Sequence, residues 1–318
     1  MAEKDYVYYP GCSLEGTAIE YQMSIQSVFK TFGVSLKEVE DWSCCGSTPA
    51  HSVDHVFAGA LAARNLAIVE KMNSSDVVTA CPACLSALRK AHKRMEASAA
   101  FKAEVNELLD EPYDCSVVAK SALQILYEDI GPEAIASKVT TAFPDLKIAP
   151  YYGCIINRPP EVMEFDNPEN PIAMDRILEA AGFQVVDFAF KVECCGAAFG
   201  VPKRTMVNQL SSKVLSMALD AGANCIAVCC QLCHQNLDLR QGQINAVMGT
   251  SFNIPVLFFT QLMGLAFGYS PADLGLDKHN IKADRLIAAT LPIGEYRQQQ
   301  EEARSKKGKK VKAKEKEA

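Results

Sequence analysis

Short apolar runs alternate with amphipathic helical stretches in the first part of the chain. A short strand is predicted over 7–9 and a helix over about 17–31, ended by Gly33. Four apolar residues at helical spacing predict the face of a second helix: Phe57, Leu61, Ile68 and Met72. Residues 77–79 form a predicted buried strand, and Pro82 suits the first turn of the next helix. This alternation favours an α/β fold with largely parallel strands.

The same order of elements returns in the second part of the chain. The stretch DYVYYPGC (5–12) parallels IAPYYGC (148–154), and DVVTACPAC (76–84) parallels CIAVCCQLC (225–233). Four apolar residues again mark one helix face: Val207, Leu210, Val214 and Met217. The apolar run 254–268 is shorter than a membrane span and is expected to form a buried strand and helix. The sequence therefore predicts an internal duplication.

The repeat divides the chain into two similar halves, residues 1–147 and 148–298, each with a small, largely parallel sheet. The connection over 98–147 is expected to be mostly helical. The 318 residues are 49% hydrophobic, which is typical of a globular protein, and carry a net charge of −6. Residues 301–318 hold eight basic and four acidic groups. This composition predicts a basic, disordered tail over 299–318.

Several classes of protein are disfavoured by the same features. The first residues lead directly into the first strand without the pattern of a signal peptide. No apolar run is long enough to span a bilayer. The body of the chain is acidic, which disfavours nucleic-acid binding. We therefore expect a soluble, cytoplasmic protein.

Thirteen cysteines are many for such a chain, and ten of them form two sets of five with one spacing pattern. The first set is Cys12, Cys44, Cys45, Cys81 and Cys84. The second set is Cys154, Cys194, Cys195, Cys230 and Cys233. The members lie at predicted strand ends and strand-to-helix turns, where parallel sheets bind ligands. The helix that begins at Pro82 would point its positive end at Cys81, which stabilises thiolates and anionic clusters.

Clustered thiols in a reducing compartment indicate metal binding or catalysis rather than disulfides. Structural zinc takes four ligands, whereas each set offers five thiols with two adjacent in sequence. A larger inorganic core with several irons can use both members of an adjacent pair. The spacing favours iron–sulfur clusters, with zinc and redox-active thiols as the alternatives.

The doubled pattern, with Cys-Cys-Gly at its centre, resembles the cysteine-rich CCG domain of the heterodisulfide reductase B subunit and its relatives. The resemblance covers about residues 5–285. The stretches that carry it are YYPGCSLEGTA (8–18), SCCGSTPAHS (43–52), FDNPENP (165–171), ECCGAAFG (193–200) and CQLCHQNLD (230–238).

The resemblance implies an oxidoreductase that acts on a sulfur group. Each set of five cysteines would hold one non-cubane [4Fe–4S] cluster. A disulfide, such as the heterodisulfide of coenzymes M and B or a related compound, would bind between the clusters and be cleaved in one-electron steps, or formed in the reverse direction. The cysteines given a catalytic role are Cys45, Cys84, Cys195 and Cys233. Cys229 competes with Cys230 as a ligand, but only Cys230 has the x-x spacing to Cys233.

The chain contains no ferredoxin-type Cys-x-x-Cys-x-x-Cys-x-x-x-Cys run, so electrons must come from elsewhere. The resemblance implies a ferredoxin-like iron–sulfur partner, a subunit of the C type, and behind it a flavin-containing subunit of the A type. Two alternatives remain: an iron–sulfur relay subunit without disulfide chemistry, and a zinc-stabilised structural subunit.

Contacts with a substrate are expected from charged or polar residues near the two motifs: Lys203, Arg204, Arg158, His51 and His234. Cys115 and Cys225 lie in apolar, strand-like runs and are expected to be buried structural cysteines. His92 and His279 are expected at the surface.

Overall fold

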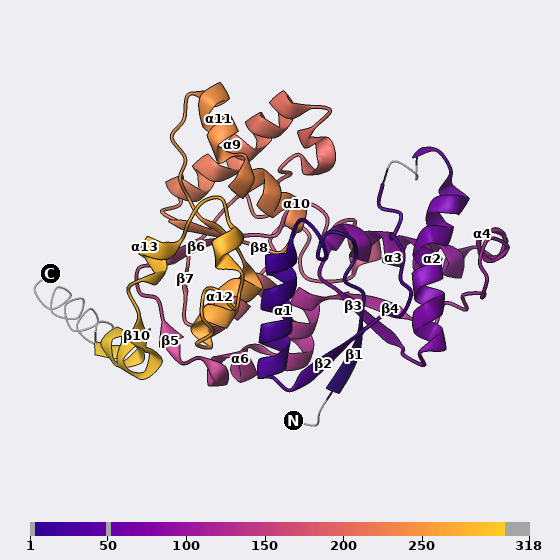
Figure 1. The fold of residues 1–318 in the computed structure, drawn as a ribbon, viewed down its shortest axis with the longest axis horizontal. Coiled ribbons are helices and arrows are strands. Elements are labelled where there is room, and N and C mark those ends of the chain that lie inside the picture. The colour runs from indigo at the N-terminus through magenta and orange to yellow at the C-terminus, as the bar shows by residue number, and fades with distance from the viewer. Residues whose placement is uncertain (1–3, 49–51, 303–318) are drawn as a thin grey trace, which may run out of the picture.

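The computed structural model describes residues 4–48 and 52–302, and it contains two parallel sheets that share one order of strands (Figure 1). The strands of the first half are β1 (Lys4–Tyr8), β2 (Val34–Glu38), β3 (Asp76–Thr79), β4 (Val118–Ser121) and β5 (Thr141–Ala142). Its helices are α1 (Ile19–Thr31), α2 (His55–Lys71), α3 (Pro82–Ala97), α4 (Ala99–Asn106), α5 (Ala122–Gln124), the π-helical η2 (Ile125–Ile130) and α6 (Pro132–Lys138).

The second half repeats this plan, with β7 and β9 shorter than their counterparts β2 and β4. Its strands are β6 (Lys147–Tyr151), β7 (Gln184–Val185), β8 (Cys225–Val228), β9 (Val256–Phe258) and β10 (Leu291–Pro292). Its helices are α7 (Pro160–Met163), α8 (Ala173–Ala180), η3 (Ala197–Gly200), α9 (Arg204–Asp220), α10 (Gln231–His234), η4 (Gln235–Leu239), α11 (Gln241–Met248), α12 (Phe259–Ala266), η5 (Leu276–Lys278) and α13 (Asp284–Ile287).

The two four-stranded sheets are built alike. Their orders are β2-β1-β3-β4 and β7-β6-β8-β9, and every pairing in them is parallel. The two registers are equivalent, since Tyr8 pairs with Val78, three residues before Cys81, and Pro150 pairs with Ala227, three residues before Cys230. All four side chains of β8 are buried, as expected for a central strand of a parallel sheet. The predicted α/β fold with two similar halves is confirmed.

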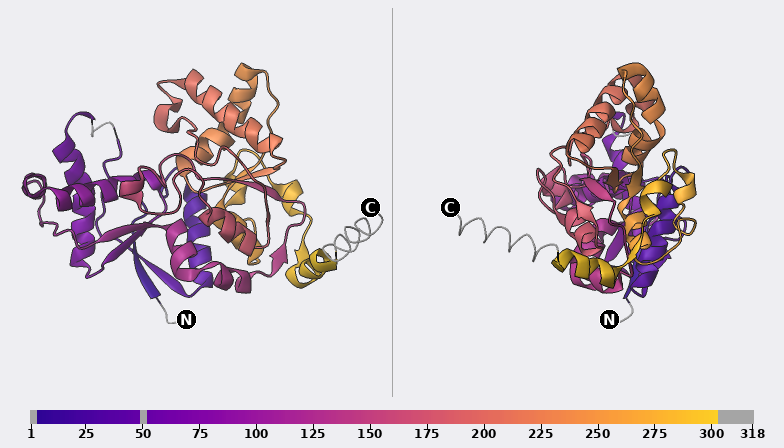
Figure 2. Two further views of the ribbon diagram at one scale, coloured as in Figure 1. Left: turned by 180° about the vertical axis from the view of Figure 1, so that it is seen from behind. Right: turned by 90° about the vertical axis from the view of Figure 1, so that its left-hand side faces the viewer.

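The halves are interlocked rather than merely adjacent. Helix α1 of the first half packs against α12 of the second, and Figures 1 and 2 show the two side by side near the centre of the molecule. In that contact Tyr21 stacks on Phe258 at 4.0 Å between ring centroids, and Ser24 Oγ lies 2.7 Å from Thr260 Oγ1. Helix α8 in turn packs against α5 and η2. Each half therefore covers part of the other, with the cysteine sites close to the shared boundary.

Two expectations about the first half need correction. The buried side of α2 is not the predicted apolar face, because Phe57 is 50% exposed while Gly59, Ala60, Ala63 and Leu66 are buried. A Cβ on Gly59 would lie 2.8 Å from the ring of Phe101, so α2 packs closely through its small residues. The connection over 98–147 is also not only helical, since it supplies β4, the fourth strand of the first sheet.

The boundary at residue 147 stays a prediction, although β6 begins there. Strand β10 pairs antiparallel with β5 and so returns the end of the second half to the end of the first. Within residues 4–48 and 52–302, none of the helices has the length and apolar character needed to cross a membrane. Most of the predicted tail lies outside the described residues.

Candidate functional site

The five cysteines of the first set meet at one edge of the first sheet. Cys12 follows β1, Cys44 and Cys45 follow β2, and the last two follow β3 at the start of α3. These strands are parallel neighbours, so their carboxyl ends lie together. The Sγ atoms of Cys45 and Cys84 are 3.2 Å apart, and the N–H of Cys84 donates to Sγ of Cys81 at 3.4 Å. Cys12 and Cys44 are exposed, whereas the other three are buried.

The second set repeats this arrangement at the equivalent edge of the second sheet. The Sγ atoms of Cys195 and Cys233 are 3.6 Å apart, and the N–H of Gly196 donates to Sγ of Cys194 at 3.3 Å. Cys230 directly precedes α10, as Cys81 directly precedes α3. The thiol of Cys229 instead lies 3.5 Å from the carbonyl oxygen of Tyr152. The position equivalent to Cys81 is therefore Cys230.

A glycine lies directly beside the sulfur atoms in each half. Gly11 has φ +73° and Gly153 has φ +72°. A Cβ on Gly11 would lie 2.9 Å from Sγ of Cys84, and one on Gly153 would lie 2.9 Å from Sγ of Cys233. No side chain can thus stand between the backbone and these sulfurs. Each site thus offers five sulfur donors next to a stretch of backbone that carries no side chain. This arrangement fits a metal cluster bound through sulfur.

A tyrosine ties the Cys-Cys loop to the first strand of each half. The hydroxyl of Tyr9 donates to the carbonyl oxygen of Ser43 at 2.7 Å, and that of Tyr151 donates to the carbonyl oxygen of Glu193 at 2.6 Å. Ser43 and Glu193 directly precede the two cysteine pairs. The same contact therefore holds each pair against its strand end.

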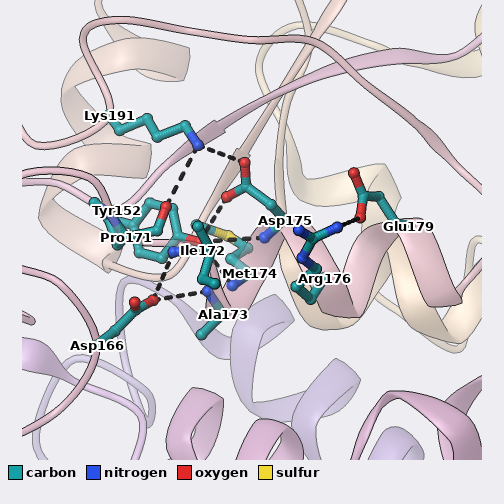
Figure 3. Close-up of polar contacts among 10 residues, drawn as sticks. All are labelled: Tyr152, Asp166, Pro171, Ile172, Ala173, Met174, Asp175, Arg176, Glu179 and Lys191. Carbon is teal, nitrogen blue, oxygen red and sulfur yellow. Dashed lines mark hydrogen bonds and ion pairs between the residues drawn. The ribbon is translucent and has the colours of Figure 1, made fainter.

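A buried ion pair supports the second site in addition (Figure 3). Lys191 pairs with Asp175, whose second carboxylate oxygen accepts from the Tyr152 hydroxyl at 2.6 Å. The backbone carbonyl of Lys191 accepts from the N–H groups of Tyr152 and Gly153. The loop before the Cys-Cys pair is thus fixed to the strand end that carries Cys154. Removing one partner of such a buried pair typically costs about 3–5 kcal/mol. The pair was not recognised from sequence.

The FDNPENP stretch closes the same region. One carboxylate oxygen of Asp166 accepts from the N–H groups of Ile172 and Ala173 at 2.8 and 2.7 Å (Figure 3). These groups lie at the start of α8, where backbone donors have no partners within the helix. Asp166 therefore fixes the entry into the helix that carries Asp175.

Contacts among the thiols lower the pKa values of some of them. The hydrogen bond with Cys84 lowers the pKa of Cys81 to about 7, and the hydrogen bond with Cys233 lowers that of Cys195 to about 7. The hydrogen bond with Cys154 lowers the pKa of Cys194 to about 6. Metals bind the thiolate form of cysteine, and both sites contain thiols that ionise near neutral pH.

We predict that Cys194 of the metal-free protein is alkylated at pH 7 on the order of tenfold faster than Cys115. Both side chains are half-buried, but burial raises the pKa of Cys115. Because the thiolate fraction of Cys194 falls as the pH falls through about 6, its own alkylation rate should fall about tenfold between pH 7 and pH 5. Its rate relative to Cys115 should not fall, since Cys115 loses thiolate over the same range as well. Peptide mass spectrometry after brief iodoacetamide treatment measures both rates. Equal alkylation rates of Cys194 and Cys115 at pH 7 would contradict the lowered pKa of Cys194.

The predicted substrate residues that the structure describes have different surroundings. The Arg158 side chain already has partners within the protein. Its guanidinium donates to the carbonyl oxygen of Pro168 and pairs with Glu169 at 2.7 Å. Lys203 and Arg204 lie exposed at the start of α9. His51 lies outside the described residues. A substrate contact of any of them stays a prediction.

His234 lies in a buried network with His279, which is 2% exposed and thus not at the surface as expected. Oε1 of Gln261 accepts from the N–H of Phe258, so Nε2 of Gln261 donates to Nε2 of His279 at 2.8 Å. His279 must then carry its proton on Nδ1 and donate it to Nε2 of His234 at 2.7 Å. Burial lowers the pKa values of His234 and His279 to about 3 and 4. Substrate binding by His234 stays a prediction. Within the described residues, the ring nitrogens of His234 face the side chains of His279 and Glu20.

Cys115 and Cys225, which were both expected to be buried structural cysteines, differ in burial. Cys225 is fully buried in β8, as expected. Cys115 is half-buried and has φ +68°, so it lies in a turn rather than in a strand.

A cavity of about 670 Å³ opens beside the first Cys-Cys-Gly loop. Its lining includes Gly46, Ser86 and Lys90 from the first half and Ile155, next to Cys154, from the second. Lys93 and Arg94 add two further cations, the first paired with Glu164 and the second 3.8 Å above the ring of Phe101. The Ser86 hydroxyl is buried and has no hydrogen-bond partner among the described residues. Sequence reasoning missed these basic residues, because α3 resembles any helix with one solvated, charged face.

Comparison with known proteins gives three findings. The family model of the cysteine-rich domain CCG matches residues 6–89 and 148–238. The B subunit of the Ferredoxin/F(420)H(2)-dependent CoB-CoM heterodisulfide reductase of Methanosarcina acetivorans is 34% identical over 79% of this chain and 85% of its own length. The 8-methylmenaquinol:fumarate reductase membrane anchor subunit of Wolinella succinogenes is 33% identical over 89% of this chain and 99% of its own length.

Among solved structures, a hypothetical protein from Helicobacter pylori matches with a TM-score of 0.68 at 14% identity. The match covers 89% of this chain and 52% of that protein, and at this identity it supports the fold alone. The family model, in contrast, covers all ten clustered cysteines and most of three of the four strands in each sheet, while β4 and β9 lie outside it. The chain therefore belongs to the family of heterodisulfide reductase B subunits, which carry the cysteine-rich CCG domain.

Proposed function

We propose that this chain is a redox subunit that holds two iron–sulfur clusters and reduces a disulfide to two thiols, or catalyses the reverse reaction. Membership of the family of heterodisulfide reductase B subunits supports the redox role. The finer part of the proposal is that both clusters are of the non-cubane [4Fe–4S] type. The first would be held by Cys12, Cys44, Cys45, Cys81 and Cys84. The second would be held by Cys154, Cys194, Cys195, Cys230 and Cys233.

The observation that carries the proposal is the presence of two equivalent groups of five cysteines that one side chain connects across the halves. Reduction of a disulfide takes two electrons and two protons and yields two thiols. When bound at the two sites, the clusters would supply one electron each. The contact between the halves is direct, because Gln231, next to Cys230, reaches Sγ of Cys81 at 2.6 Å. A molecule near this boundary would lie within reach of both sites.

The residues around the first site suit an anionic disulfide with apolar parts. The cavity joins backbone next to Cys45 with Ile155, next to Cys154. Its apolar wall includes Phe101, and its polar side carries Lys90 and Arg94. Apolar surface with a few convergent polar groups is the usual lining of a small-molecule site. We propose that this cavity orients the substrate.

Electrons would enter from partner proteins. Cys12 and Cys44 are exposed, so the first site reaches the surface, where an electron donor can approach. We propose that the donor is a ferredoxin-like iron–sulfur subunit of the C type, with a flavin-containing subunit of the A type behind it.

Reduction of the CoB–CoM heterodisulfide, named in the relatives, tests the function directly. Anaerobically purified protein with a reduced viologen dye as donor should release two thiols for every two electrons consumed. A protein with full iron content that releases no thiol from this or other disulfides would instead be an electron relay.

We predict that Lys90→Glu raises KM for the heterodisulfide about three- to tenfold, with a smaller change in kcat. The substitution reverses a charge beside the cavity, and one charge pair near a protein surface contributes on the order of 1 kcal/mol or more. Lys203→Glu is the matched control, because Lys203 is exposed but does not line the cavity. A larger effect of Lys203→Glu than of Lys90→Glu would move the substrate site to the second motif.

A further inference from the structure

One side chain connects the two cysteine sites. Gln231 belongs to the second half, between Cys230 and Leu232, and it is 5% exposed. Its Nε2 atom lies 2.6 Å from Sγ of Cys81, which belongs to the first half. The contact joins residues 150 positions apart in the chain.

The orientation of this carboxamide follows from its partner. A metal-bound thiolate accepts hydrogen bonds and donates none, so the nitrogen of Gln231 must face Cys81. The carbonyl oxygen Oε1 is then buried without a hydrogen-bond partner among the described residues. A buried carbonyl without a partner destabilises a fold, whereas Met or Leu would fill the space without this cost. Packing alone therefore does not explain an amide at this position.

The two sites differ at this position. The residue equivalent to Gln231 in the first half is Pro82, which has no side-chain donor and cannot return the contact to Cys230. The second site has a weaker donor of its own, since Nδ2 of Asn236 lies 3.5 Å from Sγ of Cys195. The residue equivalent to Asn236 in the first half is Ala87. The halves are thus alike in fold but unlike in the hydrogen bonds to their sulfurs.

We propose that Gln231 is a positioning residue that acts through Cys81 to raise the reduction potential of the first site above that of the second. A hydrogen bond to a cysteine sulfur stabilises the added negative charge of a reduced cluster and thereby raises its potential. The shorter contact belongs to the first site, so the first site takes up an electron before the second. The inference rests on the iron–sulfur part of the proposed function and not on its disulfide part.

The test is a redox titration of the holoprotein followed by EPR, with wild type compared to Gln231→Met. Met keeps the volume and removes the donor. We expect two midpoints in wild type, and we expect Gln231→Met to lower the upper one by about tenfold in the equilibrium constant, about 59 mV for one electron. Gln209→Met, the same change at an exposed position of α9, should move neither midpoint.

Variants that keep only one of the two cysteine sites show to which half the shift in midpoint potential belongs. In Cys195→Ser, which keeps the first site, Gln231→Met should still lower the midpoint, whereas in Cys45→Ser it should have no effect. A shift that appears only with the second site would overturn the proposal, as would unchanged midpoints in the otherwise wild-type protein.

A second variant keeps the test valid if Gln231→Met fails to fold. Gln231→Asn keeps a buried amide but withdraws it by one methylene, so it should shift the same midpoint in the same direction. If both variants lose iron, loss from the first site alone supports the contact, and loss from the second site or from both overturns it. A wild type without iron would refute the proposed function itself, whereas full iron with unshifted midpoints refutes only the role of Gln231.

Discussion

Replacement of Cys45 or Cys195 by Ser should halve the iron content, from about eight to about four per chain, and should lower disulfide reduction at least about a hundredfold. Both side chains are buried, at 4% and 2% exposure, and each sulfur contacts the second cysteine of the Cys-x-x-Cys pair in its own half. Serine offers no thiolate, so each variant should lose one site and leave the other intact. Iron analysis and the viologen-coupled assay measure the two effects.

Cys229→Ser is the matched control for this experiment. Cys229 is as deeply buried as Cys45 and Cys195, but its thiol lies 3.5 Å from the carbonyl oxygen of Tyr152, to which a serine hydroxyl can also donate. The variant should keep full iron, while Cys230→Ser should lose half. The reverse outcome would assign the ligand role to Cys229, and normal iron in both Cys45→Ser and Cys195→Ser would refute the ligand sets.

Alanine at Gly11 or Gly153 should also empty one site, although neither residue is a ligand. The new Cβ would lie 2.9 Å from Sγ of Cys84 in Gly11→Ala and 2.9 Å from Sγ of Cys233 in Gly153→Ala. The backbone at both positions has positive φ, which costs an alanine about 1–2 kcal/mol in addition. We expect iron to fall by about half, together with most of the activity, because a shifted sulfur in one half disables a two-site reaction.

Gly33→Ala separates the two causes. Gly33 has φ +68°, but a Cβ there would meet nothing within 4 Å. This variant should therefore unfold at a somewhat lower temperature and retain full iron. If Gly11→Ala kept its iron and lost only as much thermal stability as Gly33→Ala, the backbone at Gly11 would not cover a cluster.

The fold and the ten clustered cysteines could be predicted because the same information occurs twice in the chain. Each half repeats a strand, a Cys-Cys loop and a Cys-x-x-Cys helix start, and parallel strands bring these ends together. Pro82 marked the beginning of α3 correctly, since proline is favoured in the first turn of a helix.

The errors have physical causes that involve contacts between distant parts of the chain. Large apolar residues suggested the wrong face of α2, because close packing against Phe101 required Gly59 and alanines rather than Phe57. His279 was expected at the surface, but the segment after α12, to which it belongs, places it against His234 and Gln261. The contact of Gln231 with Cys81 could not be predicted from the sequence, since the two residues lie in opposite halves.

Metal and sulfide analysis of anaerobically purified protein, followed by EPR during titration with thiol, tests the central claim most directly. Two clusters predict about eight irons and a similar amount of sulfide per chain, with little zinc. They also predict an EPR signal that appears when thiol is added. One or more zinc ions per chain with little iron and no response to thiol would contradict the account and favour a structural role.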